Sequence, residues 1–453
     1  MGDIARESAL KVLNALDKKN LTLDMVMEDY TAKGNKLTRL DRSLVNALVY
    51  GVIRWRGRID FVITHFSKTP LTKIKPEILN TLRLGIFQIL FMTKIPDSAA
   101  VNTSVNLAKK NAPLWVVKFV NGLLRNVTKN ITSIPFPKQD DNILRYLAVE
   151  KSFPEWLIQK WIKRFGPDET ISLCDAMNTI PGITLRTNTL KTSQDDLLEA
   201  ITEDVESVSL TNVSPYGISV SRPKKQLSEF NTFKDGLFQV QDEAAQIVSM
   251  LLNPVPGDRV LDACAGLGGK TGHIAQLMAN KGEIIAVDSI PAKLKSLATE
   301  MDRLGITIVT TSVMDLNEPA GDNSPGIFDK ILVDAPCSGF GVIRRNPDGK
   351  WSQSKRNLKR YQKRQLTFLD TVKGLLKPGG VIVYAVCSTE PEEGKNVIDS
   401  FLQNNPDFTI SKPDIEKFPK LSELTDSSGT ISTLPHLHDM DGFFTARLIK
   451  DLK

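Results

Sequence analysis

Two cysteines stand where they could act on one substrate. Cys337 ends the segment DAPC and Cys387 ends the segment YAVC, and each is followed directly by a serine. A lone free cysteine is usually an inert buried hydrophobe, but each of these follows an apolar run that we expect to be a strand. Adjacent parallel strands end at one edge of a sheet, where ligands bind. The pair therefore favours covalent catalysis by a thiolate, and either sulfur could be the one that attacks.

A glycine-rich turn and three spaced carboxylates indicate the cofactor. The turn CAGLGGKT, residues 264–271, joins a predicted strand to a predicted helix and fits neither the P-loop nor the GxGxxG pattern. Asp288, Asp315 and Asp334 follow three later strands, where carboxylates can bind the ribose and the adenine of a nucleoside. Each acid alone could be a helix cap or a solvated loop residue. The ordered set favours S-adenosylmethionine over ATP or NAD.

A thiol beside a methyl donor suits methylation of carbon 5 of cytosine. That carbon is a poor nucleophile, but addition of a thiolate to carbon 6 pushes electrons onto it, so that it can attack a methyl sulfonium. Loss of the proton at carbon 5 and expulsion of the sulfur then restore the ring. Asp334 lies three residues before Cys337, and it could bind the N3/N4 edge of the base and stabilise the charge that develops there.

A basic segment follows the first cysteine motif. Residues 344–364 hold nine lysines and arginines against one acid, Asp348. Trp351 and Tyr361 lie among them and could stack on bases. We expect this segment to bind nucleic acid beside the reacting base, although a solvated basic helix is the alternative. The expected RNA contacts are Arg344, Arg345, Lys350, Trp351 and Arg356.

The elements that must position these residues alternate between strands and helices from about residue 240. The predicted strands are 259–264, 282–288, 307–311, 328–334 and 381–386, and the predicted helices are about 291–304 and 352–376. Such alternation implies right-handed crossovers and an α/β, doubly wound, Rossmann-like parallel sheet. Its ligands should lie at the carboxyl ends of the strands.

The rest of the chain predicts two further parts. Apolar residues at helical spacing run from residue 1 to about 130, so we expect an all-helical bundle there. A polar, proline-containing stretch at 132–141 reads as a linker, and a small α+β module with short strands at 182–186 and 213–220 follows. The expected domains are 1–135, 142–235 and 236–453, and the chain is multidomain.

Composition narrows the class of protein. The chain has 453 residues, of which 41% are hydrophobic, and a formal net charge of +6. Residues 1–150 carry 23 Lys/Arg against 13 Asp/Glu, which suits a polyanion partner or a solvated helical surface. Four cysteines without metal-ligand spacing argue against a disulfide scaffold and a zinc site. Without an apolar run long enough to cross a bilayer, we expect a cytoplasmic, metal-free monomer.

These motifs, in their order, resemble the RNA cytosine-5 methyltransferase family. The C-terminal motifs are DACAGLGGKT, AVD, VMD, DAPCSGFGVIRRNPD, KPGG, YAVCSTEPEE and the late HLHDMDGFF. The segments KIPDSAAVNTSVNLAKK and VNGLLRNV resemble the NusB-type helical RNA-binding domain. A NusB-like block before a methyltransferase is the layout of a bacterial group that modifies 16S rRNA.

The resemblance implies roles that the spacing leaves open. It makes Cys387 the nucleophile and Cys337 the residue that assists product release, with Asp334 and Lys270 also in the catalytic site. It places the methyl donor, S-adenosylmethionine, on the turn and the acids. Those cofactor residues are Cys264, Ala265, Gly266, Leu267, Gly268, Gly269, Lys270, Asp288, Asp315 and Asp334. It implies 16S rRNA as the partner, as naked or early-assembly RNA, with cytosine 967 as the target.

Two other functions remain open at this stage. The same chemistry could act on another RNA, such as tRNA, because the NusB-like block favours rRNA only by analogy. Alternatively, the protein could be a non-catalytic RNA-binding factor in ribosome assembly. The presence of both cysteines, Asp334 and Lys270 argues against the second of these.

Overall fold

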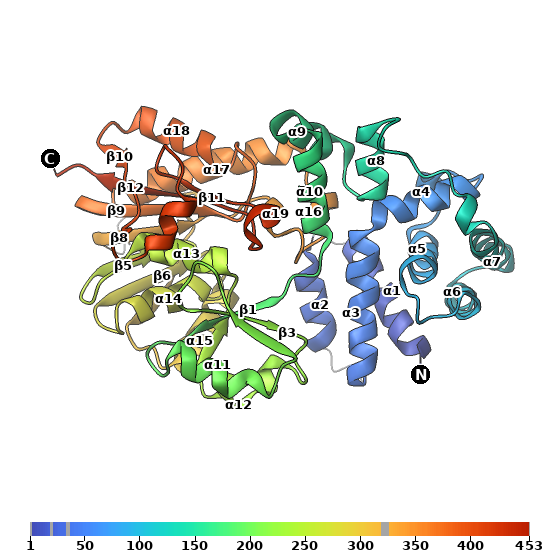
Figure 1. Ribbon diagram of the computed structural model, residues 1–453, viewed down its shortest axis with the longest axis horizontal. Coiled ribbons are helices and arrows are strands. Elements are labelled where there is room, and N and C mark those ends of the chain that lie inside the picture. The colour runs from blue at the N-terminus through green and yellow to red at the C-terminus, as the bar shows by residue number, and fades with distance from the viewer. Residues whose placement is uncertain (1, 19–20, 33–36, 319–325, 453) are drawn as a thin grey trace. The chain divides into compact units, whose positions relative to one another are not determined.

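The computed structural model describes residues 2–18, 21–32, 37–318 and 326–452. The chain forms two compact units, which we describe separately (Figure 1). Unit 1 contains Met1–Thr179 and Ile343–Ser352, and unit 2 contains Ile180–Val342 and Gln353–Lys453. The helical first part of the expected middle module therefore belongs to unit 1, and its strands belong to unit 2. In the part of the chain that is described, no helix is long and apolar enough to cross a membrane.

Unit 1 is helical, as predicted for residues 1–130. Its helices are α1 (Gly2–Lys18), α2 (Leu23–Ala32), α3 (Arg39–Arg54), α4 (Arg56–Phe66), α5 (Pro76–Phe91), α6 (Asp97–Asn111), α7 (Leu114–Lys129), α8 (Ile143–Glu150), α9 (Glu155–Phe165), α10 (Pro167–Asn178) and the short α16 (Gly349–Ser352). Local sequence explains the boundaries: Thr38 and Asp41 form a capping box at the start of α3, which satisfies otherwise unpaired N–H groups. Helix α7 buries one face at spacings of three and four, from Val116 to Val127.

Unit 2 begins with a small antiparallel sheet in the order β2-β3-β1-β4. Its strands are β1 (Ile183–Thr187), β2 (Ser207–Leu210), β3 (Gly217–Ser221) and β4 (Phe238–Val240), with helices α11 (Gln194–Thr202) and α12 (Asn231–Lys234). The strand predicted at 213–220 begins only at Gly217, because the residues before it form a turn in which the Thr211 hydroxyl donates to the Ser214 carbonyl.

The larger sheet of unit 2 has the order β10-β12-β9-β8-β5-β6-β7, and β11 pairs with β12. Its strands are β5 (Arg259–Asp262), β6 (Glu283–Asp288), β7 (Val309–Val313), β8 (Phe328–Asp334), β9 (Leu376–Val386), β10 (Phe408–Ile410), β11 (Ile431–Thr433) and β12 (Phe443–Lys450). Strands β5 to β9 pair in parallel with their neighbours in this order, and β12 pairs antiparallel with β9, β10 and β11. The α/β class is confirmed, with an antiparallel edge that the sequence reading did not anticipate.

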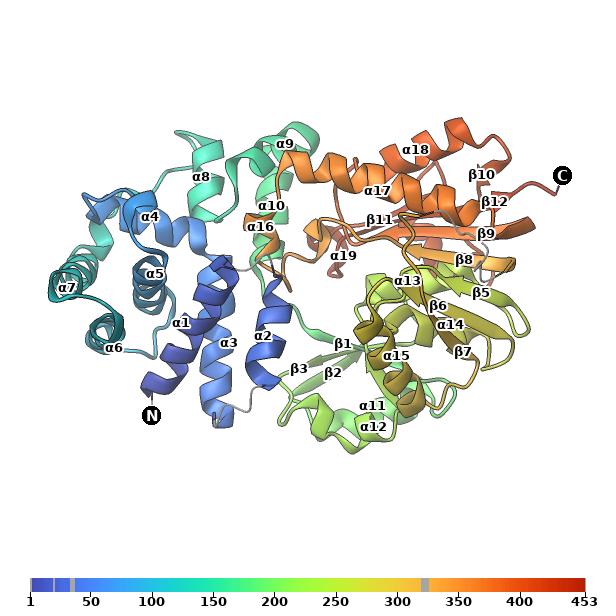
Figure 2. The same ribbon diagram turned by 180° about the vertical axis from the view of Figure 1, so that it is seen from behind.

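Helices cover both faces of this sheet (Figures 1 and 2). The covering helices are α13 (Glu243–Leu252), α14 (Gly269–Leu277) and α15 (Pro291–Leu304) on one face and α17 (Lys355–Lys373) and α18 (Lys395–Asn404) on the other. Successive strand residues alternate between the two cores: Val260 packs with the first set and Leu261 with the second. Fully buried parallel strands require this double cover, which leaves the strand ends as the exposed edge.

Candidate active site

The two cysteines lie together at the carboxyl ends of adjacent strands. Cys337 follows β8 and Cys387 follows β9, and these strands pair in parallel. Their sulfur atoms are 3.2 Å apart, and both thiols are free and partly buried. The backbone N–H of Gly341, in the loop of Cys337, donates to the Cys387 carbonyl at 3.0 Å. The two loops are therefore joined directly, and both sulfurs lie in the space at the ends of β8 and β9.

A lysine–aspartate pair stands beside this space. The Lys270 Nζ atom donates to Asp334 Oδ2 at 2.6 Å and lies 5.3 Å from the centre of the Phe443 ring. Lys270 is on α14, and Asp334 ends β8. The structure thus brings Lys270 of the cofactor turn to the strand that precedes Cys337.

The charges around the two sulfurs differ. The hydrogen bond to Cys387 raises the pKa of the Cys337 thiol well above its usual value, and burial acts in the same direction. Burial lowers the pKa of the Lys270 ammonium, but the negative charges of Asp334 and Cys387 outweigh it and raise that pKa overall. The site therefore holds a protonated lysine close to Cys387 and a protonated thiol at Cys337.

The glycine-rich turn has the shape of a ligand-binding loop. Gly266 and Gly268 take positive φ angles of 56° and 88°, a region that side chains disfavour. A Cβ atom at Gly268 would lie 2.7 Å from Leu297 Cγ, so only glycine fits there. The N–H of Gly266 donates to Asp288 Oδ2 at 3.2 Å, which fixes the turn against the end of β6.

The remaining predicted cofactor residues lie along the same strand ends. Asp288 ends β6, and its Oδ1 accepts the N–H of Ile290 at 2.9 Å. Asp315 is exposed after β7 and accepts two hydrogen bonds from Asn317. The exposed large apolar residues of the chain include Leu267, Ile290 and Val313, which belong to this turn and to the ends of β6 and β7.

Asp262 is buried under this turn, and Cys264 is partly buried there. Burial raises the pKa of the Cys264 thiol well above its usual value, and the charges of Asp334, Asp262 and Asp288 add to it. Burial also raises the pKa of Asp262 to about 6, although the Thr271 hydroxyl donates to it at 2.7 Å. Cys264 therefore stays a protonated thiol and is a poor nucleophile.

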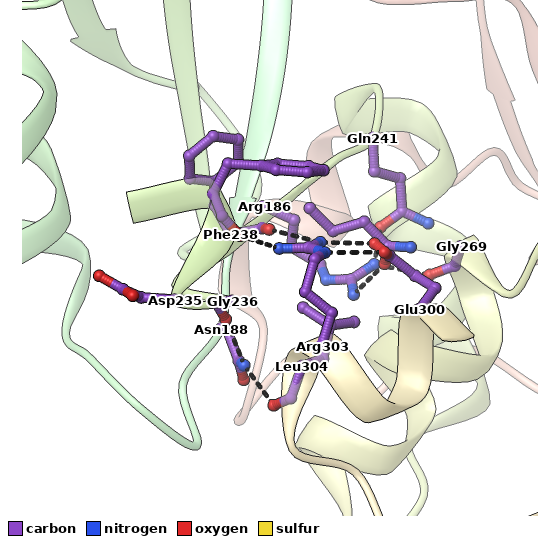
Figure 3. Close-up of polar contacts among 12 residues, drawn as sticks. Arg186, Asn188, Asp235, Gly236, Phe238, Gln241, Gly269, Glu300, Arg303 and Leu304 are labelled. Atoms are coloured by element: carbon purple, nitrogen blue, oxygen red, sulfur yellow. Dashed lines mark hydrogen bonds and ion pairs between the residues drawn. The ribbon is translucent and has the colours of Figure 1, made fainter. Parts of the chain in front are cut away.

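Sequence reasoning missed Arg186, which ties the small sheet to the cofactor turn (Figure 3). This β1 side chain is wholly buried. It donates to the carbonyl of Gly269 at 2.6 Å and to the side-chain oxygens of Gln239, Gln241 and Gln276. Burial lowers its pKa to about 9, so it stays charged at neutral pH. An arginine inside an apolar predicted strand was the available signal, since such a charge is retained only with partners.

A second set of contacts beside Arg186 joins β1 to α15. The Asn188 amide donates to the carbonyls of Gly236 and Leu304 at 2.8 and 2.9 Å, and Arg303 donates to the Phe238 carbonyl at 3.0 Å (Figure 3). The small sheet is therefore held to the cofactor half of the larger domain by buried polar contacts. It is part of the framework of the site as well as a module beside it.

The predicted RNA contacts divide into two groups, and the first needs correction. Lys350 is fully buried in unit 1, where its Nζ donates to the carbonyls of Arg54 and Ser152 at 3.2 Å and to Asn178 Oδ1 at 2.6 Å. Arg344 is only 4% exposed. Neither side chain is placed to reach a phosphate, because the segment 343–352 is packed into the helical core instead of lying on a basic helix.

The other predicted RNA contacts keep some surface. Trp351 is half-buried, and its indole N–H donates to the Ile53 carbonyl at 2.8 Å. Arg345 is also half-buried, and Arg356 is exposed near the start of α17. Helix α17 displays further exposed cations, which are Lys355, Lys359, Arg360 and Lys363.

Comparison with known families agrees with this architecture. Residues 249–449 match the family described as 16S rRNA methyltransferase RsmB/F, residues 3–129 match the NusB family, and residues 153–226 match the ferredoxin-like domain of RsmF/B-like methyltransferases. The fold and the paired cysteines define the class as a methyltransferase with a helical accessory domain.

Individual relatives cover the whole chain. The probable ribosomal RNA small subunit methyltransferase B of Bacillus subtilis is 34% identical, over 99% of this chain and 98% of the relative. Its counterpart in Synechocystis is also 34% identical, over 98% and 99%. The crystal structure of PH0851 has a TM-score of 0.83 at 26% identity and covers 99% of both chains. The chain belongs to the RsmB family of ribosomal RNA cytosine-5 methyltransferases.

Proposed function

We propose that this protein transfers the methyl group of S-adenosylmethionine to carbon 5 of a single cytosine in 16S rRNA, cytosine 967, through a covalent adduct with Cys387. The observation that carries the proposal is the approach of two free sulfurs to 3.2 Å. The Lys270–Asp334 pair joins this space to the cofactor turn. Family membership supports the reaction and the rRNA, while the named base rests on resemblance.

The residues present fit the cofactor. The positive-φ glycines of the turn allow a ligand close to the backbone, and the Asp288 carboxylate at the end of β6 suits a pair of ribose hydroxyls. Asp315 is exposed and can accept a hydrogen bond from an adenine amine. Exposed Leu267, Ile290 and Val313 offer apolar surface for the adenine ring. When bound, the cofactor supplies the electrophilic methyl group.

Different side chains of the protein take part in different steps of the covalent reaction. The Cys387 thiolate adds to carbon 6 of the base, and the electron pair of the 5,6 double bond moves to carbon 5. The Lys270 ammonium stabilises negative charge that develops during the reaction, and Asp334 accepts the amino N–H of the base. After methyl transfer, the proton at carbon 5 passes to water and the carbon–sulfur bond breaks. Cys337, 3.2 Å from the leaving sulfur, gives it a proton and so assists release.

RNA binding is assigned to both units. Unit 1 contains a cavity of about 660 Å³ whose lining includes Lys73, Lys75, Trp115 and Phe119, a combination of cations and rings that suits phosphates and bases. In unit 2, the exposed charges of α17, with Arg356 among them, suit the RNA backbone. We assign RNA binding to residues 1–135 and 142–235 together with helix α17, and methyl transfer to residues 236–453. We also propose a monomer that acts in the cytoplasm on naked or early-assembly rRNA.

The test uses the full-length protein, a labelled methyl donor and a 16S transcript, followed by mass mapping of the modified nucleotide. One 5-methylcytosine at position 967 is the expected result. Methylation of tRNA but not 16S rRNA would support the alternative function, in which the same chemistry acts on another RNA. RNA binding without methyl transfer would support a non-catalytic assembly factor. Either outcome would overturn the proposal.

A further inference from the structure

The serines that follow the two cysteines converge on one carboxylate. The hydroxyl of Ser338 donates to Glu393 Oε2 at 2.5 Å, and the hydroxyl of Ser388 donates to the same oxygen at 2.6 Å. The backbone N–H of Ser338 donates to Glu393 Oε1 at 2.7 Å. Gln365, on α17, adds a longer bond of 3.4 Å to Oε1. One side chain is therefore bonded to both cysteine loops.

Glu393 is held rigidly where it makes these bonds. Its side chain is completely buried, and its own carbonyl accepts the hydroxyl of Tyr384, a residue of β9, at 2.5 Å. Burial raises the pKa of Glu393, and the hydrogen bonds from Ser338, Ser388 and Gln365 oppose that shift. A buried carboxylate is costly unless donors surround it, so this one is retained together with its partners.

The distance between the two sulfurs depends on how these two loops are held in place. Each serine is the next residue after its cysteine, so a bond that fixes the serine also fixes the sulfur within one residue. The loops come from different strands, β8 and β9. Without Glu393 they would be joined near the sulfurs by the bond from Gly341 to the Cys387 carbonyl and by the contact of the Ser338 and Ser388 hydroxyls at 3.2 Å. Misplacement of reacting groups by about 1 Å can cost roughly 100-fold in rate.

We propose that Glu393 is a positioning residue, whose carboxylate ties the two cysteine loops together and holds the two sulfurs within reach of one base. It acts through Ser338 and Ser388 and does not touch substrate. The proposal deepens the proposed function, on which it rests for the statement that both sulfurs serve one reaction. Its test is therefore a measurement of sulfur proximity that does not require methyl transfer.

The probe is oxidation of the two thiols by diamide, which accepts the two electrons and two protons released when one disulfide forms. The rate of formation of the Cys337–Cys387 disulfide, followed by peptide mass mapping, reports how often the sulfurs meet, because disulfide geometry is strict. Mapping also separates this product from any that involves Cys174 or Cys264. Binding of an adenosyl ligand to each variant shows whether the cofactor half of unit 2 is intact.

Three variants separate positioning from general support of the fold. Glu393→Leu removes the tie, and we expect disulfide formation to slow by about 10-fold or more. Ser388→Ala releases only the loop of Cys387 and should also slow it. Glu393→Gln keeps an oxygen for the Ser338 N–H and an amide that can donate to both hydroxyls, so it should stay within about 3-fold of the wild type. Glu416→Gln, on the exposed surface, is the control.

The outcomes decide the proposal whether or not the enzyme proves active on 16S rRNA. Slow oxidation in Ser388→Ala, with recovery in Glu393→Gln and unchanged ligand binding, supports it. In the methylation assay, kcat should fall in Ser388→Ala while KM for the methyl donor stays unchanged. Wild-type oxidation rates in folded Glu393→Leu would overturn the proposal. If that variant does not fold, a wild-type rate in Ser388→Ala would overturn it equally.

Discussion

The two cysteine loops look alike in sequence but differ in their surroundings. Both read Cys-Ser, both follow parallel strands, and both serines reach Glu393. The Cys337 thiol, however, has its pKa raised by its hydrogen bond to Cys387, by burial and by nearby negative charge. Cys387 instead lies close enough to Lys270 for its negative charge to raise the pKa of that ammonium. The loop of Cys337 therefore favours a protonated thiol, and the loop of Cys387 lies beside a cation.

This difference bears on roles that the motifs leave open. A cation beside one group of a pair stabilises negative charge that develops on that group during a reaction. In the proposed mechanism Cys387 is the nucleophile, and Cys337 is the proton donor when the adduct breaks down. The chain after each cysteine differs too: the loop of Cys337 runs on to the buried Lys350 and that of Cys387 to Glu393.

Among the substitutions that test the difference between the two cysteines, replacement of Cys337 should have the largest effect on turnover. In Cys337→Ala, addition of Cys387 to the base remains possible, but release loses its proton donor, so turnover should fall by about 1,000-fold. Protein covalently joined to RNA should accumulate on a denaturing gel. Turnover at the wild-type rate, with no accumulated adduct, would show that Cys337 takes no part in the reaction.

Lys270→Met should come next, because it removes the cation that distinguishes Cys387 from Cys337. We expect kcat to fall by about 100-fold, since the variant lacks a group that stabilises charge in the reaction. Adduct formation in single turnovers should slow in parallel. Lys293→Met, which removes a partly exposed lysine 3.6 Å from Asp288, is the control and should mainly change cofactor affinity. Equal decreases of kcat in both variants would argue against a special role for Lys270.

The buried Lys350 predicts how stability depends on pH. Burial lowers its pKa well below the usual 10.5, so the unfolded chain holds a proton here at pH values where the folded chain does not. Unfolding free energy should therefore rise with pH up to about 10.5. Urea denaturation at a series of pH values below 10.5 should show this rise in the wild type and a smaller rise in Lys350→Met. An identical pH dependence in both proteins would contradict the burial of Lys350.

Substitution of the exposed lysines of helix α17 should have the smallest effect, and only RNA affinity should change. Replacing Lys355, Lys359 and Lys363 with glutamine should reduce the slope of log affinity against log salt by roughly 0.7 for each phosphate that the helix no longer neutralises. Lys412→Gln, elsewhere on the exposed surface of unit 2, should leave the slope unchanged. If the slope of the triple variant also stays unchanged, α17 does not bind RNA, and both halves of the basic segment are structural.

Much of the fold followed from periodicity and turn residues. The predicted helix 291–304 and the strand 328–334 match α15 and β8 residue for residue. Helix α15 buries apolar residues at helical spacing, and β8 buries the short apolar run 331–333. Strand β9 begins at Leu376 instead of 381, since the Lys-Pro-Gly-Gly segment continues the strand after the helix stops. The antiparallel strands β10 to β12 were missed, as pairing between distant segments leaves little local signal.

The residues of the candidate site also fall into those that the sequence indicated and those that it did not. The motifs located the cysteines, Asp334, Lys270 and the cofactor turn, because spacing places them at strand ends. They did not reveal that Arg186 and Glu393 tie those parts together, since buried polar networks depend on tertiary contacts. They also overestimated Lys350 as an RNA contact, because a run of charges in sequence does not show which side chains face solvent.

The most direct test of the account is the identity of the sulfur that bonds to the base. A 16S fragment carrying 5-fluorocytidine at the target position should trap the wild-type enzyme after methyl transfer, because fluorine cannot leave as the proton does. Peptide mapping of the trapped complex is predicted to find the nucleotide on Cys387. A nucleotide on Cys337, or no covalent complex, would contradict the division of roles between the two cysteines.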